Sequence, residues 1–444
     1  MIVHFVSPSR GRTIVVQGGQ FGSEGKGQIA AYIAQRDGVT HAVRTGSINA
    51  GHTVFFRDKV RCSMQLIPTP WVHANIQLVL GAGCYIEPAI LAREVARIRE
   101  VSGEDVRERL TIDHRCAWFG EVEHERSKEA NRHHAMGATG KGCSEAIVTK
   151  MRDRGVDSPE KRLFIHHPEA GQYNFTDTAT LLHRELAAGH NVLLEGTQGS
   201  LLDFNLGPYP FVTSRMTTAA AWLAEAGLPP VNIHTVLVLR SHPIRVAGNS
   251  GPLENETSWP ALARAINDRM IRIGLTPLIA PWALEEFEST LESVLGERFP
   301  LVVAELGARA AHFEAWTPAE RQRHRVALSE ANAAAWSLLD DATRECLRFF
   351  ELTTVTKKLR RVAHFGLRDA RYAVMVTAPA EIASTFLNYD FPELCDLQDR
   401  DLLFSEGHIL HALDQLADQL GTPISCVTTG PLQAHVLSLD SRRL

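Results

Sequence analysis

The chain has 444 residues, of which 44% are hydrophobic and 22% charged, and its formal net charge is −5. This composition is typical of a globular protein, long enough for one large α/β domain with insertions or for two to three smaller domains. The slightly acidic balance argues against a surface that coats nucleic acid. Apolar stretches fall short of the roughly 18 residues of a membrane span, and residues 1–6 lack the charged leader of a signal peptide.

Seven cysteines are scattered along the chain without Cys-x-x-Cys pairs. An odd count without framework spacing indicates reduced thiols and predicts a cytoplasmic protein. Charge and hydropathy together predict partners that are small molecules, with no role for nucleic acid or membrane.

Short runs rich in Val, Ile and Leu alternate with helix-like stretches along the first half of the chain. The expected strands are residues 13–17, 41–44, 77–80, 109–112, 191–195 and 236–240, with helical periodicity between them, as over 86–101 and 176–188. This alternation predicts an α/β fold with a mostly parallel, doubly wound central sheet. Ligands of such sheets bind beyond the carboxyl ends of the strands.

Residues 255–350 differ in composition, being rich in Ala, Glu and Arg, with helical periodicity over 259–273 and 318–339. We interpret them as a helical insertion that divides the main α/β domain into residues 1–254 and 351–444. In the last part, residues 371–376 and 423–428 are expected to be strands, and residues 407–420 a helix.

Residues 18–27 read Gly-Gly-Gln-Phe-Gly-Ser-Glu-Gly-Lys-Gly, between the first expected strand and a helix-like stretch at 28–34. A strand, a glycine-rich turn and a helix N-terminus in this order form a phosphate site, because the free N–H groups can approach an anion closely. Lys26 adds a positive charge. The loop differs from the Walker motif, since Gln20 replaces its first glycine and Gly27 its Ser or Thr.

Four further segments have residues suited to ligand binding, and each alone is a weak signal. They are 46–53 (Gly-Ser-Ile-Asn-Ala-Gly-His-Thr), 138–142 (Ala-Thr-Gly-Lys-Gly), 195–203 (Glu-Gly-Thr-Gln-Gly-Ser-Leu-Leu-Asp) with 207–214 (Gly-Pro-Tyr-Pro-Phe-Val-Thr-Ser), and 353–361 (Thr-Thr-Val-Thr-Lys-Lys-Leu-Arg-Arg). A histidine in such a loop is more often a structural hydrogen-bonding group than a catalyst, and a basic run is usually a solvated face.

Together and in this order, the segments resemble the adenylosuccinate synthetase family over residues 13–252 and again over 351–431, without 255–350. The resemblance implies a P-loop-NTPase-like sheet and a homodimer. It also implies a ligase that condenses L-aspartate with the 6-position of a 6-oxopurine nucleotide through a 6-phosphoryl intermediate, with GTP as the ordinary phosphoryl donor. Phosphoryl transfer needs Mg²⁺ and cations around the transferred group.

The resemblance assigns roles to the matching positions. Catalysis is assigned to Lys26, His52 as general acid, Ser23 and Gln198. The donor nucleotide is expected against Gly22, Glu24, Gly25, Gly27, Gly51, Thr53, Asp390, Thr428, Thr429 and Gly430. The purine nucleotide is expected against Asn49, Thr139, Gln198, Thr213, Arg152 and Arg154, aspartate against Thr356, Lys358 and Arg360, and Mg²⁺ at Ser23 and Gly51.

Position 23 departs from the family pattern Gly-Asp-Glu-Gly-Lys-Gly. The family's Asp removes the N1 proton of the oxopurine and helps to hold Mg²⁺, whereas Ser23 is uncharged and a very poor base. The same change occurs in the phage-type 2-aminoadenylosuccinate synthases, which act on dGMP. It favours a guanine nucleotide, dGMP or GMP, whose 2-amino group lies beside N1. What replaces the catalytic Asp is open.

Two other departures concern the donor and the dimer. Guanine-reading members have Lys-x-Asp where this chain has Asn388-Tyr389-Asp390, so GTP, ATP and dATP all stay open as donors. The arginine that the family extends across its dimer interface aligns with Asp153, and either neighbour, Arg152 or Arg154, could serve instead. The alternatives to a guanine-specific ligase are an IMP-using adenylosuccinate synthetase of AMP biosynthesis and a catalytically reduced nucleotide-binding homologue.

Overall fold

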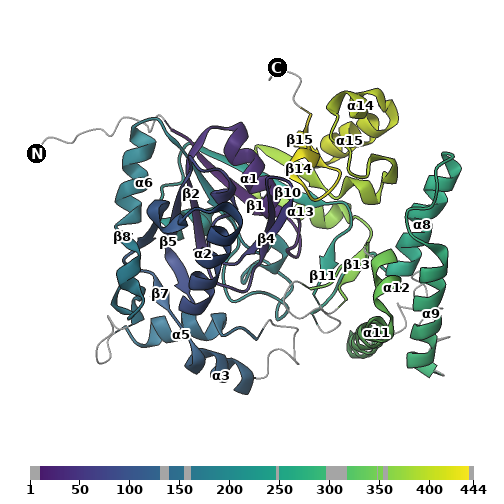
Figure 1. Ribbon diagram of the computed structural model, residues 1–444, viewed down its shortest axis with the longest axis horizontal. Coiled ribbons are helices and arrows are strands. Elements are labelled where there is room, and N and C mark those ends of the chain that lie inside the picture. The colour runs from purple at the N-terminus through teal and green to yellow at the C-terminus, as the bar shows by residue number, and fades with distance from the viewer. Residues whose placement is uncertain are drawn as a thin grey trace, which may run out of the picture.

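The computed structural model describes residues 11–130, 140–154, 162–246, 250–296, 318–347, 349–353 and 359–439. Within them, a central sheet of 11 strands has the order β16-β15-β14-β10-β1-β9-β2-β5-β6-β8, with β7 beside β5 (Figure 1). Its strands are β1 Thr13–Gly18, β2 Val39–Gly46, β5 Gln77–Ile86, β6 Leu110–Asp113, β7 Ala117–Trp118, β8 Asn174–Thr176, β9 Asn191–Glu195, β10 Ile233–Arg240, β14 Glu381–Thr385, β15 Ile424–Thr428 and β16 Val436–Ser438. The pairs are parallel apart from β15 with β16.

Helices cover both faces of this sheet. They are α1 Lys26–Arg36, α2 Pro88–Ser102, α3 Glu121–Glu129, α5 Cys143–Arg152, α6 Thr178–Ala187, α7 Ala219–Ala226, α13 Leu367–Thr377, α14 Arg400–Ser405 and α15 Gly407–Leu420. Successive residues of a strand point to opposite faces, so Val236 and Val238 pack in one core with α1 and α2, and Leu237 and Leu239 in another with α13 and α15. The doubly wound α/β fold predicted from the sequence is confirmed.

The prediction of a strand at residues 371–376 was wrong, because this segment lies within α13. Its buried positions Ala370, Ala373 and Thr377 are three and four residues apart, which is the spacing of one helix face, while Met375 is exposed. The strand that joins the sheet here is β14, which follows at once and has a single large apolar residue, Ile382.

β14 is also tied to α1 by charge. Glu381 accepts hydrogen bonds from Arg36 at the end of α1 and contacts His234 at 3.0 Å. Burial raises the pKa of Glu381, but the contacts with His234 and Arg36 outweigh it and lower the pKa to about 2. The ion pair of Glu381 with Arg36 therefore stabilises the sheet as long as Glu381 is charged.

A second body of helices has its own core. It contains α8 Trp259–Arg272, α9 Pro281–Leu295, α11 Pro318–Leu338 and α12 Asp341–Cys346, which stand together at one side of the molecule (Figure 1). A small sheet of β11 Ile244–Arg245, β13 Arg361–Ala363 and β12 Glu256–Thr257 lies against them. Because this core also takes up Ile244, Leu359, Val362 and Tyr389, the division of the chain at residues 255 and 350 stays a prediction.

A hairpin of β3 His52–Phe56 and β4 Val60–Met64 completes the described strands. Among the described residues, no helix is both long and apolar enough to cross a membrane.

Candidate active site

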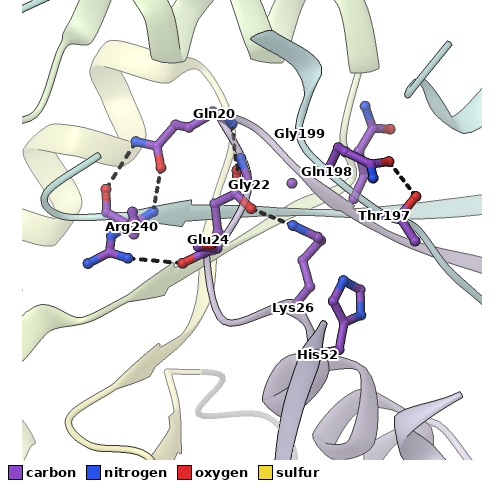
Figure 2. Close-up of polar contacts among 12 residues, drawn as sticks. Gln20, Gly22, Glu24, Lys26, His52, Thr197, Gln198, Gly199 and Arg240 are labelled. Carbon is purple, nitrogen blue, oxygen red and sulfur yellow. Dashed lines mark hydrogen bonds and ion pairs between the residues drawn. The ribbon is translucent and has the colours of Figure 1, made fainter. Parts of the chain in front are cut away.

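The glycine-rich loop joins the end of β1 to the start of α1. Gly25 precedes α1 with a φ of 82°, a backbone conformation that favours glycine. Inside the loop, the Oε1 of Glu24 accepts hydrogen bonds from the backbone N–H groups of Gln20 at 3.1 Å and Gly22 at 2.8 Å, and its Oε2 pairs with Lys26 (Figure 2). The N–H groups of Gln20 and Gly22 and the buried ammonium of Lys26 are thus all paired with one internal carboxylate, and phosphate binding at this loop stays a prediction.

The loop packs closely against its neighbours. A side chain at Gly199 would lie 2.3 Å from the carbonyl oxygen of Gln20, and one at Gly27 would lie 2.7 Å from the carbonyl oxygen of Thr53. Glycine at both positions therefore lets the loop touch the segment after β9 and lets α1 touch β3. The predicted phosphate-binding residues Gly22, Glu24, Gly25, Lys26, Gly27 and Thr53 are brought together in this way.

His52 lies in a buried charge cluster at the ends of β2 and β9. Its Nδ1 contacts Glu195, which also pairs with Arg44 at 3.2 Å and accepts hydrogen bonds from the backbone N–H of Thr69 at 2.6 Å and its hydroxyl at 3.0 Å. Burial lowers the pKa of His52 to about 4, helped by Arg44 and opposed by Glu195. Because a carboxylate can only accept, Nδ1 carries the proton of the neutral ring, and Nε2 has no hydrogen-bond partner among the described residues.

Ser23 stands at the exposed tip of the loop, with a φ of 61°. Its hydroxyl accepts a hydrogen bond from Arg360 at 2.7 Å, and its carbonyl accepts one from Arg240 at 3.0 Å. Arg240 is fully buried and pairs with Glu351, which also accepts a hydrogen bond from the Tyr389 hydroxyl at 2.8 Å. Burial raises the pKa of Glu351, but Arg240 outweighs it, so the net shift is downward and the carboxylate is charged.

Two amide side chains lie at the same sheet edge. Gln198 follows β9 and Asn49 follows β2, and these strands are neighbours with Arg44 opposite Glu195. Within the described chain, the Nε2 of Gln198 and the Oδ1 of Asn49 are buried and have no hydrogen-bond partner. Buried polar atoms are usually satisfied, so both atoms fit contacts to a ligand. The Oε1 of Gln198 is held by the Thr197 hydroxyl at 2.6 Å (Figure 2).

The residues expected at the donor base lie at the end of β15 and in the segments that follow β14 and β15. Thr428 accepts a hydrogen bond from the backbone N–H of Phe386 at 3.0 Å, and the Gly430 carbonyl accepts one from Gln28 of α1 at 3.0 Å. Thr429 is buried and its hydroxyl donates to the Leu397 carbonyl at 2.6 Å. Asp390 is partly exposed, and burial raises its pKa to about 6.

The structure places the other predicted residues less centrally. The backbone N–H of Thr213 donates to the Leu202 carbonyl at 2.8 Å, and Gly51 is exposed just before β3. Arg152 and Arg154 are exposed at the C-terminal end of α5, where Asp153 accepts hydrogen bonds from Arg152 and Arg162. Thr139, Thr356 and Lys358 lie outside the described residues.

Several charged residues of the site were not assigned from the sequence: Arg44, Glu195, Arg240, Glu351 and Arg215. A signal existed for three of them, because Arg44, Glu195 and Arg240 each end an apolar run that was expected to be a strand. Arg215 lies over the Trp222 ring at 4.6 Å and pairs with Glu225. The described residues contain no group of three His, Cys, Asp or Glu side chains that could bind a metal ion.

Comparisons with known proteins identify relatives of this chain. The model of the adenylosuccinate synthetase family matches residues 15–160 and 163–390. The match includes 255–350, which the resemblance found in the sequence left out, and it ends at residue 390, whereas that resemblance continued to residue 431. The adenylosuccinate synthetase of Methanococcus maripaludis strain C7 is 38% identical over 255 residues, covering 55% of this chain and 70% of the relative, and that of Methanocaldococcus jannaschii is 36% identical over 253 residues, covering 55% and 68%.

Two solved structures share the fold. The succinoaminodeoxyadenylate synthetase of cyanophage S-2L, bound to dGMP and to dATP as an energy donor, has a TM-score of 0.65 and 21% identity, covering 97% of this chain and 96% of the phage chain. The fully ligated adenylosuccinate synthetase of Plasmodium falciparum has a TM-score of 0.64 and 18% identity, covering 97% and 100%.

Proposed function

Because this chain belongs to the adenylosuccinate synthetase family, and is therefore a ligase that forms a C–N bond between aspartate and a purine nucleotide, we propose that its acceptor is a guanine nucleotide, dGMP or GMP. The product is then a 2-amino-N6-succino purine nucleotide. The observation that carries the proposal is Ser23, with its hydroxyl held by Arg360 at 2.7 Å.

A guanine presents two hydrogen-bond donors at this edge, N1–H and the 2-amino group. The hydroxyl of Ser23 has two acceptor lone pairs and one donor hydrogen. Arg360 uses one lone pair, which leaves the other to accept from the purine. A carboxylate here would instead pair with Arg360 and act as the base that IMP chemistry requires. Because Ser23 is exposed, a proton released from N1 can reach water through its hydroxyl.

The phosphoryl donor is assigned to the glycine-rich loop. In this proposal Lys26 stabilises the transferring charge, and His52 protonates the bridging oxygen. With a pKa of about 4, His52 is neutral before the nucleotide binds. The negative charge of a triphosphate beside Nε2 raises this pKa, so we propose that His52 gains its proton as the donor binds.

Mg²⁺, on which the family generally depends, fits the oxygen donors of this edge. The Gly51 carbonyl and phosphate oxygens would hold it, because oxygen atoms are the donors that this ion prefers. The Ser23 hydroxyl would join them in place of its contact with the purine, since Arg360 takes its other lone pair. When bound, it neutralises charge on the phosphoryl group. In the same proposal, Asn49, Gln198, Thr213 and Thr139 hold the purine nucleotide.

Aspartate is assigned to the segment around Arg360, with Thr356 and Lys358. The choice of phosphoryl donor is assigned to Asp390, whose carboxylate would accept from N1–H and N2–H of a guanine base. Without the lysine of the family pattern, ATP or dATP is an equal candidate, and dATP is the energy donor named for the phage enzyme that shares the fold. We also propose a homodimer, with Arg152 or Arg154 acting across its interface, and a cytoplasmic location.

A second candidate is an IMP-using adenylosuccinate synthetase. It is favoured by the archaeal relatives at 36–38% identity, which are named adenylosuccinate synthetase. A catalytically reduced homologue that binds nucleotide without turnover is a third.

The test is aspartate-dependent phosphate release with GTP, ATP and dATP as donors and IMP, GMP and dGMP as acceptors. Turnover with dGMP or GMP but not with IMP is the expected result. Turnover with IMP alone would establish the second candidate, and nucleotide binding without release in every combination would establish the third.

A further inference from the structure

The segment that carries Arg360 is closed at its base by hydrogen bonds. The backbone N–H of Arg360 donates to the Glu351 carbonyl at 2.9 Å, and its Nε donates to the Leu352 carbonyl at 3.0 Å. Leu352 and Leu359 form an antiparallel bridge between the two ends. We call the described residues 351–353 and 359–360 the Arg360 segment, and these bonds join its two parts.

The residues that flank this base are buried in the core of the helical body. Phe350, on one side, is 4% exposed, and Leu359 and Val362, on the other, are 3% and 1% exposed. They pack with side chains of α8, α9 and α11. The helical body thus holds both ends of the Arg360 segment. In the sequence, both ends come after the last helix of this body, α12.

One side chain of the helical body contacts the segment directly. Trp259, the first residue of α8, donates its indole N–H to the Arg360 carbonyl at 2.7 Å. Its ring is 3% exposed and stacks on Phe350, with centroids 5.7 Å apart and an interplanar angle of 26°. Trp259 is therefore fixed by packing, and its hydrogen bond fixes the backbone of Arg360.

We propose that the helical body is the support of the aspartate site, and that Trp259 is its positioning residue. Its hydrogen bond sets where the Arg360 guanidinium lies, and that guanidinium reaches Ser23 at 2.7 Å. The inference rests on the assignment of aspartate to Arg360 in the proposed function, and it holds for any purine acceptor. It gives residues 255–350 a role in substrate affinity as well as in folding.

The test compares Trp259→Phe with Trp336→Phe in the full-length protein. Phenylalanine keeps the stack on Phe350 and removes the N–H donor, so the KM for aspartate is expected to rise about 5- to 10-fold, which is more than the rise expected in the KM for purine nucleotide. Trp336 stacks on Phe350 at 6.0 Å in the same core, and its side chain makes no hydrogen bond to the described residues 351–353 and 359–360, so its variant should keep both KM values.

The Arg360→Gln variant tests the assignment of aspartate to Arg360 separately from the support role of Trp259. If it raises the KM for aspartate and Trp259→Phe does not, the support role is refuted and the aspartate assignment stands. If Arg360→Gln leaves that KM unchanged, the aspartate assignment fails and the inference fails with it. Equal rises in Trp259→Phe and Trp336→Phe would mean a general packing effect and would also refute the role of Trp259. Should Trp259→Phe not fold, Phe350→Leu loosens the stack beneath the indole and is expected to raise the same KM.

Discussion

Replacing Ser23 with Asp tests whether this position selects the purine. The backbone of residue 23 lies in the left-handed region, at a φ of 61°, where Asp and Asn are better tolerated than other residues with a side chain. The side chain is exposed, so a carboxylate there needs no burial. The substitution should therefore fold normally, and a change in activity can be attributed to chemistry.

The size of the effect follows from the neighbours of Ser23. A positioned general base contributes roughly 10²- to 10⁴-fold in rate, which is about 3–5 kcal/mol of transition-state stabilisation. Arg360, 2.7 Å from the hydroxyl oxygen, would pair with the new carboxylate and lower its basicity. We therefore expect the lower end, an increase of roughly 100-fold in kcat/KM for IMP relative to dGMP.

The assay is aspartate-dependent phosphate release with IMP and with dGMP, for the parent chain, Ser23→Asp and Ser23→Asn. Asparagine has the shape and the backbone preference of aspartate without its charge, so it controls for size. If Ser23→Asp is no faster with IMP than Ser23→Asn while both keep the parent Tm, Ser23 does not set the choice of purine.

Three further substitutions test the structure around the site. Gly27→Ala places a methyl group against the backbone of β3 and should cost about 1–3 kcal/mol of stability, seen as a lower Tm and lower kcat/KM. Glu351→Gln leaves the buried Arg240 without its counter-charge and should lower the free energy of unfolding by about 3–5 kcal/mol in a urea titration at pH 7; a loss below 1 kcal/mol would contradict a buried pair. The pKa of Glu381 is lowered to about 2, so its pairing with Arg36 stabilises the fold above pH 4.5, and this stabilisation is lost as the pH falls toward 2. Glu381→Gln should therefore make the urea midpoint less sensitive to acid over this range. An unchanged pH dependence of the midpoint would contradict the ion pair.

Much of the fold follows from local sequence, because buried parallel strands are short apolar runs. β9 matches its expected bounds, and β1 extends one residue further. The strand prediction at 371–376 was wrong because helix and strand are hard to distinguish in a short apolar run, and only packing against Leu237 and Leu239 decides the outcome. β14 was missed for the opposite reason, since its strand character comes from its neighbours β10 and β15.

The site was predictable to the extent that its residues follow strands. Loops after β1, β2 and β9 meet because parallel strands end at one edge, which brings Lys26, His52 and Gln198 to the same side. The cluster around Ser23 was harder to predict from the sequence, because Arg240 and Glu351 are 111 residues apart. The contact between Arg240 and Glu351 depends on how the helical body packs, and local sequence patterns do not predict that packing.

The charge clusters also bear on whether this chain is an enzyme or a binding protein. The group of His52, Glu195 and Arg44 is buried, and burying charges costs free energy even when they are paired. A protein that only binds nucleotide needs a cradle of backbone N–H groups and a cation, and it has no need of a buried imidazole paired with a carboxylate. A neutral imidazole with Nδ1 fixed by a carboxylate and Nε2 free is the arrangement that proton transfer requires. The pairing of His52 with Glu195 thus favours catalysis over binding alone, in keeping with the ligase family to which the chain belongs.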